Sequence, residues 1–156
     1  MNIHPLFVHF PIGLLVAYSA LELSAYLFPA LRRQAWLFPV NAFLLFVGVL
    51  AAFATLVTGD MAEELIEVAG DPNLALVETH SSFATATTVL YLVLAAGYLN
   101  RIFDRKGWFN SIIGTNRLLA WGWNAKKYLA HLILDTWLLP VLALLALIGM
   151  TITGGL

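Results

Sequence analysis

The sequence predicts an all-α integral membrane protein: one four-transmembrane-helix bundle over residues 1–156, with an amphipathic interfacial helix before the fourth helix. Of its 156 residues, 61% are hydrophobic and only 11% are charged. Soluble domains carry about 45–50% apolar and about 25% charged residues, so this chain cannot cover a water-facing surface with polar groups. About 20 apolar residues cross a hydrocarbon core about 30 Å thick, so the length allows four crossings and their connections.

Four apolar stretches are each long enough to cross a bilayer. They are residues 6–28, 37–59, 80–100 and 133–155. The first has no basic region before it and no small-residue cleavage site after it, so we expect a permanent helix rather than a removable signal peptide. Four crossings place both termini and the 60–79 connection on one side of the membrane, and the 29–36 and 101–132 connections on the other.

The distribution of charge orients this bundle. All 8 lysines and arginines lie in the 29–36 and 101–132 connections. The 60–79 connection has no basic residue and carries Asp60, Glu63, Glu64, Glu67, Asp71 and Glu78. The positive-inside rule makes the basic side cytoplasmic. We therefore expect a protein of the cytoplasmic (inner) membrane with both termini outside, in contact with the lipid bilayer and without a nucleic-acid partner; homo- or hetero-oligomers are left open.

The two long connections contain further helix signals. Residues 108–131 mix apolar, aromatic and basic side chains, as an amphipathic helix on the inner leaflet would. In the outer connection, Asp71 and Pro72 resemble an N-cap followed by proline at the first helical position, so the third helix is expected to begin at Pro72. The second helix is expected to end at Gly59 and Asp60. Both boundaries place His80 near the outer edge of the membrane.

Ionisable side chains gather in this outer layer. They are His4, His9 and His80, with the carboxylates Asp60 and Glu78. Ionisable groups at membrane depth are costly and usually face the bundle interior, which indicates a cofactor or metal site. The chain has no cysteine, so thiolate and iron–sulfur chemistry are excluded and imidazole and carboxylate remain. The alternative is that the histidines are merely hydrated or bonded to backbone carbonyls at the interface.

The first helix decides which histidine can reach such a site. Pro11 lacks an N–H and should kink or loosen the helix around Phe7. His4 and His9 lie about 140° apart on an ideal helix. With the kink, we expect His9 to point into the bundle and His4 to cap the site at the water boundary.

Small residues line the next two helices. The two rows are Gly48, Ala52, Thr55 and Gly59, and His80, Ala84, Thr87 and Tyr91. They leave room for a flat macrocycle, or they serve ordinary close helix packing. Four polar residues lie toward the inner half of the membrane, and their spacing in the sequence does not indicate a set of ligands. We interpret them as residues that form structural hydrogen bonds or extend to the membrane surface. These are Glu22, Asn41, His131 and Asp135.

The opening residues HPLFVHFPIGLLV resemble the start of a bacterial and archaeal family of small four-helix membrane proteins, the domain of unknown function DUF2231. Gly59-Asp60, His80 and a glycine-rich end to the last helix occupy corresponding places. Domains of that family are found joined to c-type cytochrome or Rieske-type domains, so the resemblance implies membrane electron transfer and points to His4, His9, Asp60 and His80. A C-terminal extension of longer relatives, and any ligand it supplies, is expected to be absent here.

Together these features predict a haem b-binding, cytochrome b-like electron carrier rather than a stand-alone catalyst. His9 and His80 would be the axial ligands, because imidazoles from facing helices can hold haem iron in a bundle core. Against haem, the outer layer offers no Arg or Lys to its propionates. The acidic connection is expected to be a solvated loop, or otherwise the docking face of a basic periplasmic or extracellular redox protein.

Two alternatives use the same layer differently. The first is a transition-metal site for Zn, Cu or Fe, because imidazole and carboxylate donors suit these ions. Its ligands would come from His4, His9, Asp60, Glu78 and His80. The second is a structural membrane subunit without a cofactor, whose histidines and small residues serve packing alone.

Overall fold

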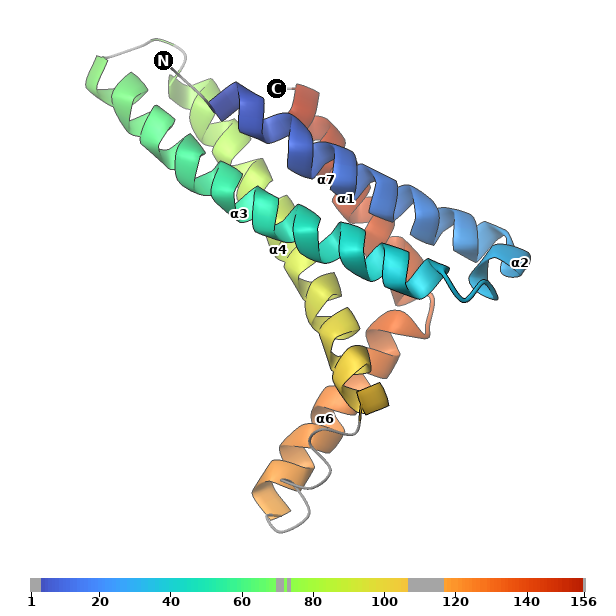
Figure 1. The fold of residues 1–156 in the computed structure, drawn as a ribbon. Helices are drawn as coiled ribbons and strands as arrows, with labels where there is room; N and C mark the ends of the chain where they lie inside the picture. The colour runs from blue at the N-terminus through green and yellow to red at the C-terminus, as the bar shows by residue number, and fades with distance from the viewer. Residues whose placement is uncertain (1–3, 70–71, 73, 107–116, 156) are drawn as a thin grey trace.

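The computed structural model describes residues 4–69, 72, 74–106 and 117–155, and all regular structure within them is helical. The helices are α1 (His4–Leu27), α2 (Pro29–Arg32), α3 (Leu37–Ala69), α4 (Leu74–Lys106), α6 (Arg117–Leu134) and α7 (Leu138–Gly155). Helices α1, α3, α4 and α7 pack into a bundle in which each contacts two of the others (Figure 1). The all-helical prediction is confirmed.

The two ends of the bundle differ. The start of α1, the end of α7 and the facing ends of α3 and α4 lie together, and we call this the terminal end (Figure 1). At the opposite end lie α2 with Arg32, the last turns of α4 with Arg101, and α6. We call this the basic end. The arrangement agrees with the predicted path of the chain, in which both termini share a side with the acidic connection.

Among the described residues, three helices are long and apolar enough to cross a membrane: Val8–Leu27, Leu37–Met61 and Leu74–Asp104. A fourth span is formed if Lys127–Leu134 and Leu138–Thr153 count as one, although these two segments are bent by 69°. Large apolar side chains such as Phe43, Leu50 and Val57 are exposed on the outside of the bundle. An apolar exterior of this kind is expected where lipid, not water, surrounds the helices.

The prediction of one continuous fourth helix over 133–155 is wrong, because the helix is interrupted between Leu134 and Leu138. Proline lacks an N–H and crowds the carbonyl four residues before it, so Pro140 prevents a straight helix from continuing through Thr136. The Thr136 hydroxyl instead accepts a hydrogen bond from the Leu138 N–H at 3.2 Å, as a side-chain cap does. The break lets α6 turn away from α7.

Three other boundaries also differ. Helix α3 continues to Ala69 instead of ending at Asp60, because good helix formers such as Glu63 and Glu64 follow the apolar stretch. The short helix α2 was not expected; it starts at Pro29, which suits the first helical turn. Helix α4 begins at Leu74, and the expected cap Asp71 lies outside the described residues. Helix α6 occupies the place of the expected amphipathic helix from Arg117 onward, and residues 108–116 lie outside the described part.

Candidate functional site

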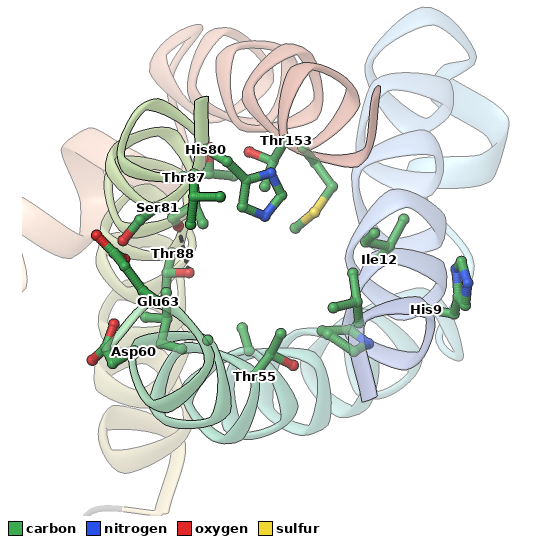
Figure 2. Close-up of a pocket in the computed structure, with 18 of the residues that line it drawn as sticks. His9, Ile12, Thr55, Asp60, Glu63, His80, Ser81, Thr87, Thr88 and Thr153 are labelled. Atoms are coloured by element: carbon green, nitrogen blue, oxygen red, sulfur yellow. Dashed lines mark hydrogen bonds between the residues drawn. The ribbon is translucent and has the colours of Figure 1, made fainter. Parts of the chain in front are cut away.

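A pocket of about 560 Å³ lies between α1, α3, α4 and α7 in the half of the bundle nearest the terminal end, and we call it the His80 pocket (Figure 2). Helix α1 contributes Val8, His9, Pro11 and Ile12, and α3 contributes Ala52, Thr55, Leu56, Gly59, Asp60 and Glu63. Helix α4 contributes Leu76, Val77, His80, Ser81, Ala84, Thr87 and Thr88, and α7 contributes Met150 and Thr153. The lining is mainly apolar, with a few polar side chains among small residues.

His80 is the polar side chain that enters this space most directly. Its ring points into the opening between the four helices, on the side where Thr153 of α7 lies (Figure 2). The ring is half-buried and makes no hydrogen bond to any described residue. Both ring nitrogens are therefore available to a ligand. The row predicted below it, Ala84 and Thr87, lines the same pocket.

Threonine hydroxyls add weak polarity to the lining. Thr88 donates to the Ala84 carbonyl and Thr153 to the Gly149 carbonyl, both at 2.8 Å. Because each hydroxyl uses its hydrogen within its own helix, its oxygen can still accept a hydrogen bond. Near the His80 imidazole the pocket thus offers threonine hydroxyl oxygens, which are hydrogen-bond acceptors without charge.

The charged lining residues are acidic. Asp60 and Glu63 lie on the α3 side of the pocket, apart from the His80 ring (Figure 2). No Lys or Arg occurs among the described lining residues. Glu63 was missed as a site residue because the second helix was expected to end at Asp60. The continued helix carries Glu63 one turn beyond Gly59, onto the same face.

His9 does not face His80. It is exposed, and its ring lies on the outer side of α1, although the residue is part of the pocket lining (Figure 2). On an ideal helix His9 lies about 180° from Tyr18, which is fully buried. Helix α1 runs from His4 to Leu27 with Pro11 inside it, and the expected inward turn of His9 is not observed.

The remaining candidate ligands are not gathered either. The side chain of His4 lies outside the described part of the chain, and Glu78 is exposed and does not line the pocket. Among the described side chains, no group of three or more His, Asp or Glu residues could hold a metal ion. Of the predicted layer, His80, Asp60 and His9 are lining residues of the pocket, and only the His80 ring is seen to point into it.

The polar residues of the other half form separate contacts. Asn41 donates to Glu22 at 2.8 Å, as expected of structural hydrogen bonding. Arg101 pairs with Asp135 at 2.9 Å, and His131 stands 4.0 Å from the same carboxylate. None of these residues lines the His80 pocket.

Comparison with known proteins gives one match. Residues 1–154 match a family described as "Predicted membrane protein (DUF2231)". No curated protein and no solved structure matches the chain.

Proposed function

Starting from the membership of this chain in the DUF2231 family of predicted membrane proteins, we propose that it is a membrane-embedded electron-transfer protein that binds haem b at His80. Membership also implies that the apolar exterior contacts a lipid bilayer. The observation that carries the proposal is the His80 ring, which makes no hydrogen bond with the described part of the chain and points into a largely apolar pocket of about 560 Å³. Ligand pockets usually measure about 300–1,000 Å³ and combine apolar walls with a few polar groups.

The pocket offers one side chain that would bind haem iron. His80 supplies an imidazole, the common protein ligand of haem iron, while Ala52, Gly59 and Ala84 leave space for a flat ring. His9 is turned away, so the proposal rests on His80 alone and not on the predicted pair. Bound haem would supply a one-electron carrier; the apolar walls would exclude water and thereby influence its potential.

The charges favour a second candidate, a neutral lipid-soluble ring compound such as a quinone. Asp60 and Glu63 line the pocket and no described lining residue is cationic, so propionates would meet like charge. A neutral carbonyl group meets no such repulsion and can accept a hydrogen bond from His80. With this occupant the chain would still act in electron transfer, as the site where a membrane-soluble carrier binds.

A metal ion has less support than either ring compound, because the described carboxylates and histidines form no cluster of three. We place the protein in the cytoplasmic membrane with the terminal end outside, on the basis of the charge distribution. A purely structural subunit remains as an outcome of the experiment below.

The experiment is an optical spectrum of the purified protein in oxidised and reduced form, with organic extraction and elemental analysis of the same sample. We expect haem absorption bands in the spectrum. His80→Ala should abolish them, and His131→Ala should leave them intact. His131 is the matched control because it is exposed at the basic end, away from the pocket. A colourless protein with an extractable quinone selects the second candidate. A sample without haem, quinone or metal overturns the proposal.

A further inference from the structure

A second polar site lies inside the membrane-spanning part of the bundle. Glu22 of α1, Asn41 of α3 and Tyr98 of α4 converge there, each within a span. Asn41 Nδ2 donates to Glu22 Oε1 at 2.8 Å, and the Tyr98 hydroxyl donates to the same oxygen. Glu22 is 7% exposed and Asn41 is 0% exposed. A carboxyl group buried at this depth is costly, and such groups usually belong to ion or proton pathways.

This site has more polar atoms than the described residues satisfy. Both hydrogen bonds to Glu22 end on Oε1, and none from the described residues reaches Oε2. Asn41 Oδ1 and the Tyr18 hydroxyl are buried and have no hydrogen-bond partner within the described ranges. The Tyr18 ring stands edge-on to that of Tyr98, with centroids 5.9 Å apart. Buried polar atoms are nearly always bonded, and where protein groups are lacking an ordered water usually completes them.

The site is connected to the basic end by a second pocket of about 360 Å³. Glu22 and Tyr98 form part of its wall, while Arg32 and Gln34 are exposed residues of its lining. The rest of the lining comes from Ala25, Tyr26, Ala35, Leu37, Phe38, Arg101, Leu134, Thr136, Leu139 and Pro140. The carboxyl group is therefore buried in the bundle but adjoins a space that opens among arginines.

The groups around Glu22 select the ligand. Tyr18 of α1, Asn41 of α3 and Tyr98 of α4 are uncharged donors or acceptors. Arg32 of α2 and Arg101 of α4 are cations of the pocket lining. Arg101 is paired at 2.9 Å with Asp135, beyond α6. A metal cation would meet two guanidinium groups and a single carboxylate, which is a poor donor set. A proton needs only one carboxyl oxygen.

We propose that Glu22 is a proton-binding site that exchanges with the aqueous phase at the basic end through the second pocket. On uptake a hydronium ion in the pocket breaks one of its O–H bonds as an O–H bond forms at Oε2 and water is left behind, and on release the proton returns to a water molecule in the pocket. This proposal does not depend on the occupant of the His80 pocket, which lies in the other half of the bundle.

The first test is infrared difference spectroscopy of the full chain in lipid vesicles, between acidic and alkaline buffer. We expect a carboxylic-acid C=O band that titrates, shifts to lower frequency in D₂O and is absent in Glu22→Gln. Asp135→Asn, which removes the carboxylate paired with Arg101 at the same end, should keep the band. Tyr98→Phe should retain the band at a changed frequency, because it removes one hydrogen bond from Oε1. A spectrum without a Glu22-dependent, deuterium-sensitive band overturns the proposal.

The second test concerns the route of exchange. Gln34→Trp should narrow the second pocket and slow deuteration of the Glu22 band several-fold. Arg33→Trp is the matched control, because Arg33 is an exposed neighbour that does not line the pocket. Equal deuteration rates in the two variants would refute entry through this pocket. Gel filtration and the amide infrared band establish that each variant is folded. If Glu22→Gln aggregates, Glu22→Asp is used instead, and the band is then expected to change in frequency rather than to disappear.

Discussion

Gly48 of α3 lies so close to Leu15 of α1 that a Cβ added to the glycine would stand 2.6 Å from Leu15 Cδ2. Leu15 is fully buried and contributes to the central apolar cluster. Small residues allow helices in lipid to approach closely, where packing contacts replace the hydrophobic effect as the source of stability. The row containing Gly48 thus includes at least one close helix contact, as the packing interpretation of that row requires.

Gly48→Ala is expected to lower stability. The added methyl group must displace Leu15, and overpacking of this kind costs about 1–3 kcal/mol. The better helix propensity of alanine offsets about 1 kcal/mol of that loss. Thermal unfolding in detergent should show a lower midpoint for Gly48→Ala. Gly13→Ala is the control, since nothing lies within 4 Å of its added Cβ; an equal loss in both variants would contradict this account of the contact.

The two histidines at the His80 pocket should differ in their effect on a bound ligand. His80→Ala should remove haem or a quinone, because its ring enters the pocket. His9→Ala should keep most of the ligand, because its ring lies outside α1. Ligand content per protein, measured after identical purification, compares the two. Loss of the ligand in His9→Ala alone would show that α1 is rotated in the functional state.

The orientation in the membrane can be checked by cysteine labelling, which is clean because the chain has no native cysteine. Cysteine at Glu64 lies near the terminal end, and cysteine at Lys106 lies at the last residue of α4, at the opposite end. A membrane-impermeant maleimide added to intact cells should label Glu64→Cys and leave Lys106→Cys unlabelled until the cells are lysed. Labelling of Lys106→Cys alone in intact cells would show that the orientation is the opposite of the predicted one.

The acidic end of α3 should control association with a basic soluble redox protein. Glu64 and Glu67 are exposed there and do not line the pocket. Their replacement by glutamine should slow electron exchange with a basic c-type cytochrome at low salt, where screening lengths approach about 30 Å, and have little effect at high salt. Stopped-flow spectroscopy measures this rate. Equal rates for the unmodified protein and the glutamine variant at low salt would indicate a partner within the membrane.

Local sequence was sufficient for the spans of α1, α3 and α4, because each needs only an uninterrupted apolar stretch. It was less reliable at helix ends. Gly59 and Asp60 resemble a stop, but the residues that follow form helix well and α3 continues. In the last apolar stretch, Pro140 is the sequence signal for the break in the helix before Leu138.

The sequence by itself determined the class of protein, the family, the segregation of charge and the chemical types present at each end. Tertiary structure decided which face of each helix turns inward. Helix α1 is apolar on nearly all sides, so its pattern does not distinguish the lipid-facing side from the core. Its rotation is fixed by packing of residues such as Leu15 and Tyr18 against other helices, and this turns His9 outward. The same packing brings Glu22 to Asn41 and Tyr98, a contact between three helices that no spacing along one chain segment could reveal.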